Sequence, residues 1–176
     1  LLPQFRRITV NGPKGPQAHG ELMASTTEIV RQLRSKASPA NLQGMGRFGI
    51  MLERRLGVSV PDMRRIAKDV GKDHELAAKL WKTGIAEAKI VASMIAVPEE
   101  MNAKDMDTWV LGLDSWDVCD QVCMNLFEKT LFARRKISEW SKREEEFVKR
   151  AAFALIACLA WHDKQAPDEE IDIIKY

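Results

Sequence analysis

The chain has 176 residues, of which 45% are hydrophobic and 30% are charged, and these values are typical of a globular domain or of a short array of stacked repeats. No run of about 18 apolar residues is present, which excludes a transmembrane helix. The net charge of +2 is too small to indicate a polyanion-binding protein by itself, although basic pairs and clusters recur along the chain.

The elements predicted in chain order are helices. Residues 1–22 contain NGPKGPQAHG, which breaks any periodicity, and we expect a flexible leader or tag remnant there rather than a signal peptide. From residue 23 onward, helix caps precede apolar residues at helical spacing, and no useful strand pattern appears. The predicted helical segments are TTEIVRQLRSKA, ANLQGMGRFGIMLERRL with a break at its glycines, GVSVPDMRRIAKDVG, DHELAAKLWKTG, IAEAKIVASMIA, NAKDMDTWVLGL, SWDVCDQVCMNLFEKT, ISEWSK, EEEFVKRAAFALIACLAWHDK and APDEEIDIIKY.

This succession of helices predicts the fold class. Roughly eight to ten helices joined by short links indicate an all-α fold, and helix pairs of about 10–20 residues favour a right-handed α-solenoid of HEAT-like helical repeats. A strict sequence repeat is not visible, so this prediction depends on the helix lengths and on the resemblance described below. We expect a single domain over residues 23–176.

The segment DSWDVCDQVCMNLF carries an acid inside a largely apolar helix. On a helical wheel of 100° per residue, Asp120 lies about 40° from Trp116, between Phe127 and Met124, at the rim of the apolar face. Trp116 is four residues earlier and therefore lies directly beside it. The same wheel assigns four polar residues to the solvent face, namely Asp117, Gln121, Asn125 and Glu128.

Arg150 is also on the apolar side of its helix. The predicted apolar stripe of the 144–161 segment runs from Phe147 through Cys158 to Trp161, and Arg150 lies beside it, near the helix N-terminus, where the macrodipole disfavours a cation. Such an arginine requires an anion, either a carboxylate or a phosphate. Two interpretations therefore stay open: Asp120 and Arg150 form a buried salt bridge, or they line a cleft with the Trp116 indole as its wall.

The three cysteines, Cys119, Cys123 and Cys158, fall in apolar helical contexts. They indicate buried thiols in a reducing cytoplasm rather than a disulfide framework. Cys119 and Cys123 stand one helical turn apart, but only His162 follows at a plausible distance to complete a zinc site. We therefore expect core packing and no metal, and a cytoplasmic location, nucleoid-associated in a bacterium.

Several segments together resemble one family. SWDVCD, with its W-x-x-x-D pair, is similar to the core motif of the DNA alkylation repair family (AlkD-type DNA glycosylases), and FVKRAA is similar to a later helix of that family that carries an arginine. GMGRFGI, GVSVPDMRRIAK and LWKTGIAEAKIVASMI resemble further family segments, in the same order over residues 24–165.

The resemblance implies a HEAT-like solenoid that holds duplex DNA containing alkylated bases in a basic concave face. It implies hydrolysis of the N-glycosidic bond of cationic N3- or N7-alkylpurines, with no cofactor and no metal, by a monomer. Asp120 would be the catalytic carboxylate, Trp116 the aromatic wall and Arg150 the clamp on a backbone phosphate. Family members use a further aromatic residue in a later repeat, so we expect that the chain, which stops at Tyr176, is truncated at its C-terminus.

The other basic residues give further candidates for DNA contacts. Arg47 follows a pair of glycines, so its backbone can approach a phosphate closely, and Arg64, Arg65 and Lys68 form a cluster that suits a basic face. A surface position in a broken helix suits Arg47 nearly as well, and a solvated face is the better single interpretation of the cluster. The alternative function is a catalytically inactive HEAT-repeat scaffold that binds nucleic acid or a protein partner.

Overall fold

The computed structural model describes residues 24–47, 50 and 52–162. The predicted leader and the predicted last helix, APDEEIDIIKY, lie outside the described residues. Within them every regular element is helical, as expected for an all-α chain. The elements are α1 (Thr26–Ser35), α2 (Pro39–Gly46), α3 (Val60–Val70), α4 (His74–Trp81), α5 (Ala86–Ile95), α6 (Ala103–Val110), α7 (Trp116–Asn125), α8 (Ala133–Trp140) and α9 (Glu146–His162), with short 3₁₀ turns at Pro98–Glu100 and Phe127–Lys129.

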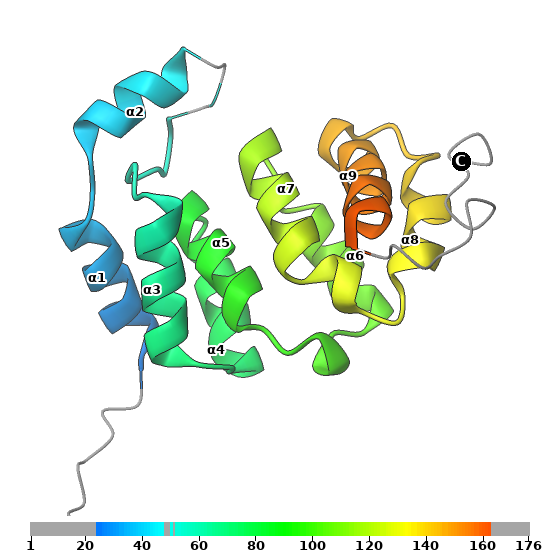
Figure 1. Ribbon diagram of the computed structural model, residues 1–176, viewed down its shortest axis with the longest axis horizontal. Helices are drawn as coiled ribbons and strands as arrows, with labels where there is room; N and C mark the ends of the chain where they lie inside the picture. Colours follow the sequence, from blue (N-terminus) through cyan, green and yellow to red (C-terminus); the bar gives the residue numbers. More distant parts are fainter. Residues whose placement is uncertain (1–23, 48–49, 51, 163–176) are drawn as a thin grey trace, which may run out of the picture.

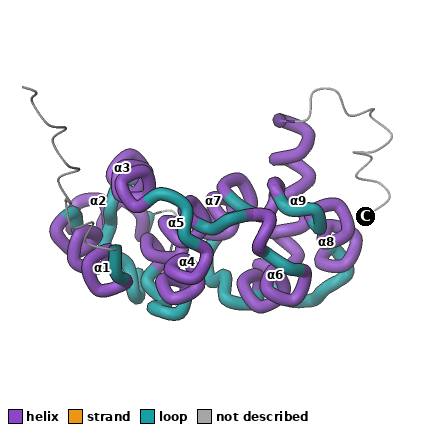
Figure 2. The backbone as a smooth tube through the Cα atoms, turned by 90° about the horizontal axis from the view of Figure 1, so that it is seen from below, coloured by secondary structure: helices purple, strands orange, loops and turns teal. Residues whose placement is uncertain are grey.

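The helices form two layers (Figures 1 and 2). In the first layer α3, α5, α7 and α9 pack side by side in chain order. In the second layer α4, α6 and α8 follow one another: Trp81 of α4 stacks on Trp109 of α6 with ring centroids 4.3 Å apart, and α6 bonds to α8 through Asp107 and Lys136. Such stacking is the arrangement of a helical-repeat solenoid. None of the described helices is long and apolar enough to span a membrane.

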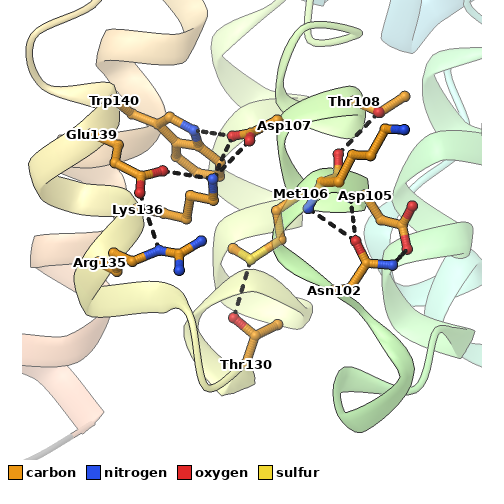
Figure 3. Close-up of polar contacts among 11 residues, drawn as sticks. Asn102, Asp105, Met106, Asp107, Thr108, Thr130, Arg135, Lys136, Glu139 and Trp140 are labelled. Atoms are coloured by element: carbon orange, nitrogen blue, oxygen red, sulfur yellow. Dashed lines mark hydrogen bonds and ion pairs between the residues drawn. The ribbon is translucent and has the colours of Figure 1, made fainter.

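A buried lysine joins the second layer at its C-terminal end (Figure 3). The ammonium of Lys136, whose side chain is 2% exposed, lies 2.7 Å from Asp107 and 2.6 Å from Glu139. The indole of Trp140 also donates a hydrogen bond to Asp107, at 2.8 Å. Partial burial raises the pKa of Asp107, but the hydrogen bonds from Lys136 and Trp140 outweigh it and hold that pKa below its usual value. The pairing compensates the charge that α8 buries.

The segment between α2 and α3 contains a glycine whose backbone lies very close to its neighbours. Gly57 has a φ of +74°, and a Cβ placed there would lie 2.4 Å from the carbonyl oxygen of Ser38. Its N–H donates to Glu87 at 2.7 Å, and its carbonyl accepts from Asn41 at 2.8 Å. The backbone of Gly57 therefore touches α2 and α5 at the same time, which leaves no room for a side chain.

Gly57→Ala is expected to destabilise the protein by about 2–6 kcal/mol, because backbone strain of about 1–3 kcal/mol adds to a clash of about 1–3 kcal/mol with rigid backbone. Gly71→Ala is the matched control. Gly71 has a φ of +79°, but a methyl group added there would meet no atom within 4 Å, so this variant has the strain without the clash. Urea denaturation of both variants measures the difference. Equal destabilisation would contradict the close approach of Gly57.

Candidate active site

The first turn of α7 presents an aromatic ring and a carboxylate on one edge. Trp116 is the first residue of α7 and is 40% exposed. Asp120 follows one turn later, and its side chain is 38% exposed. Cys119 and Cys123 on the adjacent face are fully buried. The predicted position of Asp120, at the rim of the apolar face and beside Trp116, agrees with this geometry.

Arg150 of α9 reaches both of these residues. Its Nε donates to Oδ1 of Asp120 at 3.1 Å, and its Nη2 donates to Oδ2 at 2.8 Å. The guanidinium carbon also lies 5.9 Å from the centre of the Trp116 ring, within the range of a cation–π contact. The hydrogen bond to Asp120 raises the pKa of Arg150. The structure thus brings the three predicted residues together.

The structure has features of both interpretations of Asp120 and Arg150, the salt bridge and the cleft. Asp120 and Arg150 form a bidentate ion pair, but the Arg150 side chain is 42% exposed, so the pair is not buried. It lies between two cavities. One cavity, of about 370 Å³, is lined by residues of α2, α3, α5 and α7 and of the segment before α3, and these include Trp116 and Asp120; we call it the α3–α7 cavity. The other, of about 320 Å³, lies between α7 and α9 and also includes Asp120.

Asp117 is not on the solvent face, which corrects the helical-wheel prediction. Its carboxylate accepts two hydrogen bonds from the guanidinium of Arg55, at 2.6 and 2.7 Å. Arg55 also donates to the hydroxyl of Ser115 at 2.6 Å, so the N-cap residue of α7 bonds an arginine instead of its own helix. Burial raises the pKa of Asp117, but the Arg55 hydrogen bonds outweigh it and the net pKa is lowered.

The wheel is wrong for Glu128 as well. The Glu128 side chain is only 6% exposed, and it lies 2.7 Å from His162 near the end of α9. The predicted stripe of α9 also shifts: Val148, Ala151 and Leu155 are buried, whereas Trp161 is 76% exposed. The reason is that α9 packs against both α7 and α8. Its buried face therefore includes one side that contacts α7 and another that contacts α8.

Glu87 of α5 is a buried carboxylate next to the candidate site, and the sequence did not predict it. Its side chain lines the α3–α7 cavity, and the residue is 1% exposed. Its carboxylate accepts hydrogen bonds from the backbone N–H groups of Leu56 at 3.0 Å and Gly57 at 2.7 Å. The signal that could have found it is a glutamate inside the apolar segment IAEAKIVASMIA, since carboxylates are rarely buried without a partner.

The three residues of the predicted basic cluster, Arg64, Arg65 and Lys68, do not share one environment. Arg64 and Lys68 line a groove of about 340 Å³ that also includes Lys72 and reaches Asn125 of α7. Arg65 instead pairs with Asp62 at 2.8 Å. Arg47 is exposed at the C-terminal cap of α2, and no described contact joins it to the Trp116, Asp120 and Arg150 group. The roles of these four residues stay predictions.

Two further lysines extend the basic groove. Burial lowers the pKa of Lys72, and the nearby charge of Lys129 lowers it further. Lys72 donates to the carbonyl oxygens of Met94 and Ala96 at 2.9 and 2.8 Å. Lys129 follows α7 and lines the next cavity along the same face. The basic residues therefore continue from α3 towards α7.

The cysteines pack in the core beneath this surface. The Cys119 and Cys123 thiols lie 3.8 and 3.7 Å from the carbonyl oxygens of Phe147 and Ala151 on α9. A hydrogen bond with Cys119, together with burial, raises the pKa of the Cys123 thiol well above its usual value. Burial raises the pKa of Cys158 to about 11. Cys123 and Cys158 are therefore protonated at neutral pH and serve as packing groups.

Comparisons with known proteins agree with this architecture. The family model described as "DNA alkylation repair enzyme" matches residues 29–176. The chain is also similar to a solved structure described as "A new family of proteins related to the HEAT-like repeat DNA glycosylases with affinity for branched DNA structures", with a TM-score of 0.71 and 23% identity over 83% of this chain and 60% of that one. This chain thus spans less than two thirds of that protein. A comparison with curated proteins gives no match. The expected HEAT-like solenoid is confirmed.

Proposed function

Because this chain belongs to the DNA alkylation repair enzyme family, we propose that it hydrolyses the N-glycosidic bond of cationic N3- or N7-alkylated purines in duplex DNA. The observation that carries the proposal is the convergence of Trp116, Asp120 and Arg150 on an accessible surface, with Arg150 bonded to Asp120 and placed over the Trp116 ring. A carboxylate, an indole face and a guanidinium are the groups that such a reaction uses.

The chemistry needs no general acid for the leaving group. An alkylated purine already carries a positive charge, so it departs as a neutral base with the electrons of the broken bond. The sugar then becomes an oxocarbenium ion; water adds to it at C1′, and the proton that this water loses passes to the solvent, which completes the hydrolysis. The Asp120 carboxylate stabilises that cation and orients the water, and the Trp116 ring favours a cationic base in contact with it.

Arg150 has to change partners during DNA binding. In the free protein it engages both oxygens of Asp120. A backbone phosphate is an equally suitable partner for a guanidinium. When Arg150 binds a phosphate, the carboxylate of Asp120 is released towards the sugar.

The direct test is release of methylated purine from alkylated duplex DNA by the purified protein. Free base, separated from the DNA and quantified, is expected to accumulate with time and with enzyme concentration. Unmethylated duplex and spontaneous depurination at the same temperature are the controls. No release above the spontaneous rate would reject the proposed activity.

A second candidate function is a DNA-binding scaffold without excision activity. The engagement of both Asp120 oxygens by Arg150 favours it, since this pair could serve only to join α7 to α9. The affinity for branched DNA in the description of the similar structure makes four-way junctions a suitable probe. Tighter binding of a junction than of a duplex, with no base release, would support the scaffold.

The basic groove gives a prediction that holds under both functions. Lys68→Ala and Arg64→Ala are each expected to weaken duplex binding uniformly across sequences and to reduce the slope of log K against log salt by about 1. Arg65→Ala is the matched control, because Arg65 pairs with Asp62 instead. Fluorescence anisotropy at several salt concentrations measures the slopes. Equal effects of all three changes would show that the groove does not face DNA.

A further inference from the structure

Trp116 occupies the part of α7 that a helix supports least. It is the first residue of that helix, and it is 40% exposed. The first turn of a helix frays readily, because its N–H groups have no acceptor within the helix. An N-cap side chain usually supplies one such acceptor, but in the described chain the Ser115 side chain makes no cap bond to α7. The position of the Trp116 ring therefore depends on contacts from outside α7.

Arg55 supplies such contacts on both sides of Trp116. Its Nη2 donates to the hydroxyl of Ser115 at 2.6 Å and to Oδ1 of Asp117 at 2.6 Å. Its Nη1 donates to Oδ2 of Asp117 at 2.7 Å. These two partners directly precede and follow Trp116 in the chain. Because the guanidinium is a planar fork that binds oxygens at fixed angles, it restricts the backbone from which the indole projects.

The segment that carries Arg55 is itself fixed on α5. Arg54 has a φ of +55°, a conformation that residues other than glycine seldom adopt. Its carbonyl oxygen accepts a hydrogen bond from the first N–H of α5 at 3.1 Å. The N–H groups of Leu56 and Gly57 donate to Glu87 of the same helix, at 3.0 and 2.7 Å. Strained backbone persists only where its surroundings hold it, and here α5 holds the residues on either side of Arg55.

Arg150 also contacts Trp116, but from the side that DNA approaches. Its guanidinium carbon lies 5.9 Å from the centre of the ring, and its side chain is 42% exposed. When Arg150 binds a backbone phosphate, its guanidinium turns from Asp120 towards the DNA. Arg55 is buried, with its side chain 3% exposed, so its bonds to the start of α7 stay in place while DNA binds.

We propose that Arg55 is a positioning residue of the active site. By bonding Ser115 and Asp117 it fixes the first turn of α7, and it thereby keeps the Trp116 indole in contact with the alkylated base while Arg150 engages the DNA. Its effect on base release rests on the proposed function, whereas its effect on the mobility of Trp116 does not. Arg55 acts through the indole and touches no reacting atom.

The test removes the guanidinium fork without leaving a charge buried. Arg55→Met combined with Asp117→Leu replaces the ion pair by apolar side chains and leaves the net charge unchanged. Lys136→Met combined with Asp107→Leu is the matched control, because it removes another ion pair with a buried cation, between α6 and α8, and leaves α7 untouched. Urea denaturation confirms that each double variant is folded.

The first readout is the mobility of Trp116, measured by ¹⁵N relaxation of its backbone and indole N–H groups. These resonances are assigned with Trp116→Phe. Because Arg150 also contacts the ring, the measurement is made in an Arg150→Ala background. The heteronuclear NOE of Trp116 is expected to fall when the Arg55 pair is replaced and to keep its value in the control. An unchanged NOE in the folded Arg55 double variant overturns the inference.

The second readout is the rate of base release, with Arg150 present. The Arg55 double variant is expected to release methylated purine about 10- to 100-fold more slowly in single-turnover reactions, the effect of a misplaced active-site group. Its duplex affinity should stay about equal, since the buried Arg55 does not contact DNA. The control should keep both values. An equal loss of rate in the control would show a general effect of stability and overturn the positioning role.

Arg55→Lys tests the fork itself, and it decides the question if the double variant does not fold. Lysine keeps the positive charge beside Asp117 but offers a point charge in place of a planar fork, so it cannot hold Ser115 and both Asp117 oxygens together. This variant should be folded, with a more mobile Trp116 and a slower release of base. Wild-type mobility and a wild-type rate in Arg55→Lys would refute the inference.

The two proposals can fail separately. If no protein releases base but Trp116 becomes mobile without Arg55, the excision proposal fails and the hold of Arg55 on Trp116 stands. If the wild type releases base and the Arg55 double variant releases it equally fast, excision stands and the positioning role fails.

Discussion

Asp120→Asn is expected to lower the rate of base release by roughly 10²- to 10³-fold, the effect of removing one group that stabilises a charged transition state. Asparagine keeps the shape of the side chain and one acceptor oxygen but lacks the negative charge that faces the developing sugar cation. Single-turnover release from methylated duplex measures the change. Asp114→Asn is the control, because it alters the same charge near the start of α7 while leaving the Trp116, Asp120 and Arg150 group intact.

The affinity of Asp120→Asn for duplex DNA, measured beside its rate of base release, distinguishes the two candidate functions. Loss of the Asp120 charge frees Arg150 from its ion pair, so duplex affinity should stay equal or increase. A glycosylase therefore loses rate while it keeps affinity. A scaffold shows no release in either protein and only the change in affinity. Asp120→Asn that releases base as fast as the wild type would disprove the catalytic role of this carboxylate.

Asp117→Ala is expected to lower the free energy of unfolding by about 3–5 kcal/mol, the usual loss when one partner of a buried ion pair is removed. The Arg55 side chain is only 3% exposed, and without Asp117 its one remaining side-chain partner among the described residues is the Ser115 hydroxyl. The double change Arg55→Met with Asp117→Leu removes both charges and should restore most of the stability. Urea denaturation of the three proteins measures this, and a single variant as stable as the wild type would contradict it.

The Asp117 contribution depends on pH with a definite sign. Its pKa is lowered in the folded protein, so the unfolded chain binds the proton more readily. The stabilisation is therefore complete above the unfolded pKa of about 3.9 and is lost as the pH falls through the lower folded pKa. Wild type and Asp117→Ala should differ most near pH 7 and converge in acid. A difference that stays constant far into the acid range would show that the carboxylate acts by packing alone.

The local part of the site could be predicted from the sequence. Trp116 and Asp120 are four residues apart on one helix, and the helical period alone places them on the same edge. The exposure of Asp120 at the rim follows from the same period. Arg150 stands out as a misplaced cation for the same reason, because Val148, Ala151 and Leu155 around it define the buried face of α9.

The long-range part could not be predicted. Arg55 lies 62 residues before Asp117. The sequence around either residue does not indicate that the two form a pair. Glu87 bonds backbone N–H groups about 30 residues earlier, which carry no side-chain signature at all. The wheel therefore assigns Asp117 to solvent. A helical wheel describes one helix, whereas the exposure of a polar residue depends on which neighbouring helix covers it.

The sequence by itself determined that the chain is helical, the core residues of α7 and the pairing of an indole with a carboxylate, because these depend on spacing within about one helical turn. It did not fix every helix: residues 52–56 of the predicted second helix are not helical, and α8 begins at Ala133, ahead of the predicted ISEWSK segment. Only the tertiary structure decided that Arg150 reaches Asp120, that Arg64 and Lys68 line a groove while Arg65 does not, and that a cavity opens between Glu87 and Trp116. Cavities and ion pairs of this kind exist only between packed helices. Their geometry depends on the distances between α3, α5, α7 and α9, which no local pattern encodes.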